Sequence, residues 1–85
     1  MEIVVSSFYR YIELANAESF QLELLDFCKK SDIKGKILVA KEGINGVVSG
    51  TKEQIDEYEK KLRSYKGFNN ITFKRNLWKI FKVEK

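Results

Sequence analysis

The sequence has no histidine, no proline and a single cysteine, Cys28. Without histidine the chain can form neither a Ser-His-Asp triad nor a Cys-His pair, and the usual Cys/His zinc site is excluded as well. One cysteine cannot form an internal disulfide, which is typical of proteins in a reducing cytosol. No apolar run approaches the roughly 20 residues that span a bilayer, and no signal-peptide pattern is present. We therefore expect a cytoplasmic chain with no membrane contact and with no catalytic residue, cofactor or metal site of its own.

Eighty-five residues are enough for one domain and leave no room for a second core. Hydrophobic residues make up 44% of the chain and aromatic residues 13%, a composition that favours a packed domain over a disordered segment. There are no internal repeats and no linker-like stretches. The sequence predicts a single domain over residues 1–85.

The net charge of +4 is concentrated at the C-terminal end. Residues 74–85 carry five basic side chains and one acidic side chain, whereas the first 73 residues carry eleven of each. A basic segment of this kind can face an anionic partner such as RNA. The alternative that charge alone favours is the ordinary solvated edge of a sheet, where lysines discourage pairing with other strands. Charge alone leaves both interpretations open.

Hydrophobic periodicity predicts strands and helices in the order β-α-β-β-α-β. The strands are expected at residues 3–12, 36–40, 45–50 and 70–75, the helices at 17–31 and 52–66, and a further strand at 78–83 is an open alternative. This order is that of the ferredoxin-like α+β fold, in which both helices cover one face of a four-stranded antiparallel sheet. We expect the strand at 3–12 to be central and to pair with the strands near 45–49 and 70–75.

Both predicted helices have capping signals and one apolar face. Asn16 is expected to cap the first helix, and Thr51 with Gln54 forms a capping-box pattern at the second. The apolar positions are Phe20, Leu24, Phe27 and Cys28 in the first helix, with Leu25 beside them, and Ile55, Tyr58, Leu62 and Tyr65 in the second. On this face Cys28 is expected to be buried and unreactive, because apolar surroundings raise the pKa of a thiol.

The stretch "KILVAKEGINGVVSG", residues 36–50, contains three of the five glycines. A G-x-x-G loop clamps nucleotides in KH domains, but there it joins two helices, whereas here both flanks have the composition of strands. The Gly-Lys-Ser/Thr of a Walker loop is absent. The stretch therefore predicts a hairpin, in which Gly43, Asn45 and Gly46 supply the positive φ angles of the turn and a neighbouring bulge.

The segments "SFYRYIEL", "LLDFCKKSDIKGKI" and "KGKILVAKEGINGVVSGTKEQID" resemble the rhodanese-related tRNA uridine hydroxylases. The resemblance covers about residues 5–68, and its most specific part is "EGING", residues 42–46. It implies an N-terminal ferredoxin-like (acylphosphatase-like) domain, normally followed in cis by a rhodanese domain whose loop cysteine is associated with the chemistry. It also implies that the complete proteins use oxygen to convert the wobble uridine of certain tRNAs to 5-hydroxyuridine. No rhodanese domain follows in this sequence, so it represents either an excised domain or a naturally short relative.

Three functions follow as expectations from the resemblance and the residues. The first is an accessory domain that binds tRNA, with bases stacked on exposed aromatics of the sheet and phosphates held by basic residues. The aromatic candidates are Phe8 or Tyr9, Tyr11, Phe73, Trp78 and Phe81, and the basic candidates are Arg10, Lys36, Lys41, Lys74, Arg75 and Lys79. The second is a docking module without nucleic-acid contact. The third is an acylphosphatase-like enzyme, which is disfavoured because the loop "ELANAES" has no glycine and no arginine to hold a phosphate; Asn45 would be its only candidate.

Overall fold

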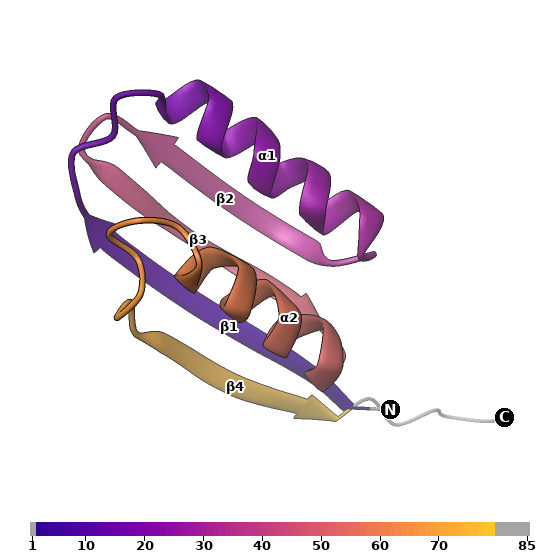
Figure 1. Cartoon of the computed structure of the whole chain (residues 1–85). Coiled ribbons are helices and arrows are strands. Elements are labelled where there is room, and N and C mark those ends of the chain that lie inside the picture. Colours follow the sequence, from indigo (N-terminus) through magenta and orange to yellow (C-terminus); the bar gives the residue numbers. More distant parts are fainter. Residues whose placement is uncertain (1, 80–85) are drawn as a thin grey trace, which may run out of the picture.

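The chain forms one sheet of four antiparallel strands with both helices on the same side of it (Figure 1). The computed structural model describes residues 2–79. Its elements are β1 (Glu2–Tyr11), α1 (Ala17–Lys30), β2 (Lys34–Ala40), β3 (Gly43–Gly50), α2 (Lys52–Arg63) and β4 (Phe73–Lys79). The strand order is β2-β3-β1-β4, with β1 paired to both β3 and β4. This confirms the predicted ferredoxin-like α+β fold.

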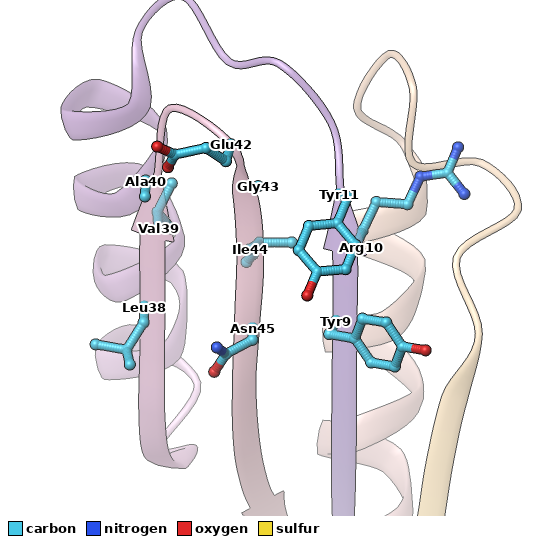
Figure 2. Close-up of a pocket in the computed structure, with 10 residues that line it drawn as sticks. All are labelled: Tyr9, Arg10, Tyr11, Leu38, Val39, Ala40, Glu42, Gly43, Ile44 and Asn45. Carbon is cyan, nitrogen blue, oxygen red and sulfur yellow. The ribbon is translucent and has the colours of Figure 1, made fainter.

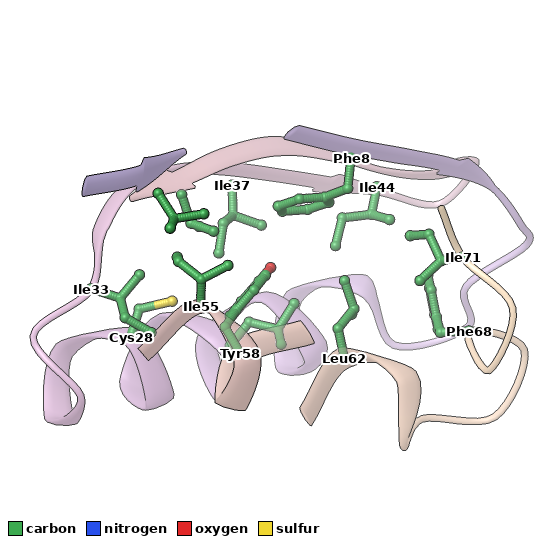
Figure 3. Packing of buried hydrophobic residues seen from close by; sticks show 13 residues of the cluster. Phe8, Cys28, Ile33, Ile37, Ile44, Ile55, Tyr58, Leu62, Phe68 and Ile71 are labelled. Atoms are coloured by element: carbon green, nitrogen blue, oxygen red, sulfur yellow. The ribbon is translucent and has the colours of Figure 1, made fainter. Parts of the chain in front are cut away.

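The register of β1 decides which side chains face the helices. Val4, Ser6 and Phe8 are buried on the helix side, so the residues between them point to the opposite side of the sheet. Figure 3 shows Phe8 from the sheet and Tyr58 and other side chains from α2 pointing into one shared layer. The fully buried residues of α2 are Ile55, Tyr58 and Leu62, which confirms three of its four predicted apolar positions. The fourth, Tyr65, lies beyond the end of α2 at Arg63 and is partly buried.

Cys28 lies in this layer on the inner side of α1. Its side chain is buried, and burial raises the pKa of the thiol to about 11. A thiol with this pKa is almost entirely protonated at neutral pH, and the thiolate is the reactive form. The placement of Cys28 on the apolar face is therefore confirmed.

The two predicted helix caps behave differently. The hydroxyl of Thr51 accepts a hydrogen bond of 3.2 Å from the Gln54 amide, and the Gln54 side chain accepts one of 2.8 Å from the Thr51 amide. This confirms the capping box. Asn16 stands at the N-terminus of α1, but its side chain makes no capping hydrogen bond. Its ψ of 61° lies outside the extended region that aims a capping side chain at the first-turn amides, so the prediction of a side-chain cap was wrong.

The glycine stretch is a hairpin, as predicted, but its turn lies earlier than expected. The ladder between β2 and β3 begins at the pair Ala40 and Gly43, so Lys41 and Glu42 form the turn. Gly43 has a φ of 150°, which favours glycine. Asn45 and Gly46 are regular members of β3 and neither has a positive φ, so their assignment to the turn was wrong.

Gly46 has a packing role in place of a turning role. It faces the helix side of the sheet, where a Cβ would lie 2.6 Å from the Lys36 carbonyl oxygen and 3.0 Å from Cζ of Phe8. A larger residue would therefore displace the Phe8 ring or the neighbouring strand. The need for glycine here comes from close approach, which no local turn pattern reveals.

The last strand also differs from its predicted bounds. Ile71 is buried in the core, and β4 starts at Phe73 and runs continuously to Lys79. Trp78 and Lys79, expected at the start of a further strand, belong to β4, and the rest of that segment lies outside the described residues. Within residues 2–79 no helix is long and apolar enough to cross a membrane.

Candidate nucleic-acid interface

The side of the sheet opposite the helices is uncovered in the part of the chain that the structure describes (Figure 1), and we call it the open face. Its positions follow from the register, because paired residues share a face. They are Ile3, Val5, Ser7, Tyr9 and Tyr11 in β1, Lys34, Lys36, Leu38 and Ala40 in β2, Asn45, Val47 and Ser49 in β3, and Lys74, Asn76 and Trp78 in β4. None of these positions is acidic.

Five of the large hydrophobic side chains on the open face are exposed to solvent. Its large exposed hydrophobic residues are Tyr9, Tyr11, Leu38, Val47 and Trp78. Tyr11 is 86% exposed and Tyr9 is 70% exposed, although both belong to a central strand. Exposed aromatic and aliphatic side chains gathered on one face of a sheet are a feature of interaction sites.

Two lysines lie at the ends of one row across the open face. Lys36 of β2 is paired with Val47, and Val47 is paired with Ser7 in β1. Ser7 is in turn paired with Lys74 of β4. Three strand spacings separate the two lysines, or about 14 Å between backbones. The row therefore has apolar and small residues in its centre and one cation at each edge.

Tyr9 and Tyr11 form a ridge at the hairpin end of the open face. Their ring centroids are 6.1 Å apart and the rings are inclined by 71°. On one side of the ridge a hollow of about 570 Å³ lies over β2 and β3, and its lining includes Leu38 and Asn45 (Figure 2). On the other side a hollow of about 690 Å³ lies between the end of β1 and the start of β4. Flat aromatic rings beside open space suit the stacking of an unpaired base.

The structure brings only some of the six predicted basic residues to the open face. Lys36 and Lys74 lie on it, and Lys41 lies in the adjoining β2–β3 turn. Arg10 belongs by register to the helix side, but its side chain extends past the end of the sheet toward the loop before β4 (Figure 2). Lys79 is the last residue of β4 and pairs with Glu2; its side chain lies outside the described part.

Arg75 points to the helix side and is held by carboxylates. Its Nε and Nη2 atoms donate hydrogen bonds of 2.9 and 2.8 Å to the two oxygens of Glu59, and Nη2 also donates one of 2.7 Å to Asp56. These bonds, chiefly those to Glu59, raise the pKa of the Arg75 guanidinium. Hydrogen bonds from Lys52 and then Arg75 lower the pKa of the Asp56 carboxyl. A guanidinium neutralised in this way is not available to a phosphate, so Arg75 does not join the candidate interface.

The register also separates the aromatic candidates. Phe8 and Phe73 face the helices and pack edge to face with centroids 5.7 Å apart, so they belong to the core. Tyr9, Tyr11 and Trp78 lie on the open face, with Trp78 opposite Ile3 at the far end from the tyrosines. Phe81 lies outside the described residues.

Sequence reasoning missed three open-face side chains: Lys34, Leu38 and Val47. The alternation in "KGKILVA" contained the signal, because Lys34, Lys36 and Leu38 share the period of a strand. The apolar run "KILVA" is nearly continuous, as in a central strand, and hides this alternation, whereas β2 lies at the edge of the sheet. Lys34 makes a well-exposed ion pair of 3.2 Å with Asp32, so it is the least available cation of the face.

The loop after β1 does not form a phosphate cradle. In such a cradle backbone amides point freely at the anion. Here the Ile12 amide donates a hydrogen bond of 2.9 Å to the carbonyl oxygen of Glu42, and the Leu14 amide donates one of 2.8 Å to the carbonyl oxygen of Lys41. Both amides are therefore already engaged. Asn45 lies on the open face between Tyr9 and Leu38. The described residues also contain no group of three His, Cys, Asp or Glu side chains placed to hold a metal ion.

Comparison with known proteins shows that the chain is similar in sequence to part of proteins named tRNA uridine(34) hydroxylase. The chain is 46% identical over 74 residues to a protein named tRNA uridine(34) hydroxylase from Staphylococcus carnosus, a match that covers 87% of this chain and 23% of that protein. It is 48% identical over 67 residues to the protein of the same name from Acholeplasma laidlawii, covering 79% and 21%. The chain thus spans less than a quarter of these relatives, and the matching part is their N-terminal domain.

Solved structures with low sequence identity share the fold. A bacterial light-regulated adenylyl cyclase matches 98% of this chain and 25% of its own, with a TM-score of 0.68 and 17% identity. A de novo designed protein matches 95% of this chain with a TM-score of 0.53 and 16% identity. The family model described as the UPF0176 acylphosphatase like domain matches residues 3–82. The chain therefore belongs to the family of UPF0176 acylphosphatase-like domains.

Proposed function

We propose that this domain is the accessory, tRNA-binding part of a tRNA uridine hydroxylase and that the open face holds an unpaired stretch of the tRNA. The observation that carries the proposal is the composition of that face: exposed tyrosines and lysines with no acidic position. The names of the relatives, which act on uridine 34 of tRNA, agree with such a ligand.

Each part of the proposed interface has a physical task. Unpaired bases stack on aromatic rings with a gain of about 1–3 kcal/mol per base, largely without regard to sequence. Lys36 and Lys74 contact phosphates at the two edges of the sheet, and Lys41 and Arg10 extend this cationic rim at the hairpin end. Lys79 stays a prediction, because its side chain is outside the described residues. We exclude Arg75, since Glu59 and Asp56 already neutralise it.

In this proposal the domain has no turnover alone, and a rhodanese domain in cis carries out the chemistry in the cytoplasm. The open face lacks the sequence signatures of the RRM, so binding is weak and dominated by phosphate contacts. With three to five cations engaged, the logarithm of affinity falls with the logarithm of salt concentration at a slope of roughly −2 to −4.

The test is a titration of tRNA into ¹⁵N-labelled protein at about 50 mM and 200 mM salt. We expect chemical-shift changes at Tyr9, Tyr11 and their strand neighbours, which weaken at the higher salt. The double variant Lys36→Gln/Lys74→Gln loses most of the binding. The matched control Lys29→Gln/Lys60→Gln removes the same charge from the helices and retains tRNA binding. Equal losses in both variants, or no shifts at either salt concentration, contradict the proposal.

A docking module is the second candidate, and the exposed Leu38 and Val47 favour it. In that case the open face packs against a rhodanese domain, and Leu38→Asp abolishes the contact. The same labelled protein distinguishes the two functions. A docking module gives no shifts with tRNA at low salt, and its open-face signals move only when a rhodanese domain is added.

A further inference from the structure

The hollow between the end of β1 and the start of β4 has a composition that suits an anion. Two of its lining residues, Arg10 and Lys74, are cations, and three others, Ser7, Asn70 and Thr72, are neutral and polar. The remaining lining residues are aromatic or aliphatic, and none is acidic. An anion entering this hollow therefore meets positive charge and hydrogen-bond donors without a competing carboxylate.

The hollow exists because β1 is longer than its partner on this side. The ladder between β1 and β4 ends at the pair Phe8 and Phe73, and β1 continues to Tyr11. Before Phe73 the chain turns inward, so that Ile71 is buried in the core. Tyr9 and Tyr11 consequently border open space on the β4 side, and both line the hollow together with Lys74, which is paired with Ser7.

Arg10 is placed differently from the other arginine of the sheet, Arg75. Its Nε atom is buried and has no hydrogen-bond partner, and within residues 2–79 its guanidinium makes no ion pair. Arg75, by contrast, is held by two carboxylates. Figure 2 shows the Arg10 guanidinium at the outer end of an extended side chain, pointing away from the β2–β3 hairpin. The stem is thus packed, while the planar fork, whose geometry matches a phosphate, has no partner among the described residues.

We propose that this hollow is a phosphate subsite, in which Arg10 and Lys74 bind one backbone phosphate of a single-stranded RNA while the adjacent base stacks on Tyr9. The inference rests on the proposed function and deepens it, because it assigns one nucleotide of the ligand to a defined place. Arginine supplies two parallel hydrogen bonds to the phosphate oxygens, and lysine supplies a mobile point charge from β4.

The experiment compares binding of a short oligouridylate by the wild-type chain and by Arg10→Gln, Lys74→Gln and Arg10→Lys at several salt concentrations. Lys29→Gln, on the outer surface of α1, is the control for general charge. Each of Arg10→Gln and Lys74→Gln is expected to reduce the magnitude of the salt slope by about 0.7, the value for one phosphate contact with a single strand. Arg10→Lys keeps this slope but binds more weakly than wild type, because the fork is lost. Lys29→Gln leaves the slope unchanged.

Titration with inorganic phosphate, followed at the Arg10 Nε–Hε signal, reports the subsite independently of base stacking. The expected result is a shift of this signal in the wild type that Lys74→Gln weakens. If oligouridylate and tRNA bind but Arg10→Gln behaves like Lys29→Gln, the subsite is refuted and the proposed function stands. If neither nucleic acid binds the wild type, the proposed function itself fails. Amide spectra of the variants with wild-type dispersion exclude unfolding as the cause.

Discussion

The hydroxyl of Ser6 donates a hydrogen bond of 2.8 Å to the carboxylate of Glu59 and so joins β1 to α2 inside the protein. Both residues are buried, and Arg75 of β4 donates two further hydrogen bonds to the same carboxylate. A buried carboxylate is tolerated only when it is paired and hydrogen-bonded. The cluster therefore connects three elements through polar groups that are mutually satisfied.

We predict that Glu59→Ala lowers the free energy of unfolding by about 2–3 kcal/mol. The change leaves the Ser6 hydroxyl buried without its partner and removes the main partner of Arg75. Urea unfolding measures the effect, with Glu57→Ala as a control at an exposed position of the same helix. Similar losses in the two variants would mean that the buried cluster contributes nothing specific.

Lys74 and Arg75 are neighbours on β4 but face opposite sides of the sheet, and their substitutions should have opposite consequences. Arg75→Gln should destabilise the fold by about 1–2 kcal/mol, because it unpairs Glu59, and should leave the salt dependence of RNA binding unchanged. Lys74→Gln should preserve the melting temperature and weaken RNA binding. A loss of binding in folded Arg75→Gln would place the interface on the helix side.

Two glycines of the hairpin should resist substitution for different reasons. Gly43→Ala should cost more than about 1 kcal/mol, because a Cβ is strained at its φ of 150° and collides with the Arg10 carbonyl oxygen. Gly46→Ala should cost about 1–3 kcal/mol through overpacking against Phe8. Thermal unfolding checks both, with Ser49→Ala in the same strand as the control. Unchanged melting temperatures for the glycine variants would contradict the observed hairpin geometry.

Cys28 should react slowly with a thiol reagent in the native protein and rapidly in urea. Burial raises its pKa from 9.0 to about 11, so the folded state favours the neutral thiol. The stability that this group contributes is complete below pH 9 and is lost as the pH rises through 11. Labelling should accordingly accelerate over that window, whereas fast labelling at pH 8 would show that the inner face of α1 opens readily.

Local patterns in the sequence were sufficient to predict the element order and the fold. The spacing of Ile55, Tyr58 and Leu62 identified the buried face of α2, and Thr51 with Gln54 identified its start. These signals depend on residues within one or two helical turns of each other, so they can be read without knowledge of the rest of the chain. The family resemblance likewise depended on contiguous residues.

Only part of the candidate interface could be predicted from the sequence. Basic and aromatic residues could be identified as candidates, but their sorting depends on the pairing of β1 with strands more than 30 residues away. A shift of one residue in that register would exchange Tyr9 with Phe8 and Lys74 with Arg75 between the two faces. The sequence by itself determined which elements form and which basic and aromatic side chains are available. The tertiary structure alone decided which of these side chains pair with carboxylates in the core and which remain exposed to a ligand. The reason is that strand register and long-range ion pairing are properties of the assembled sheet.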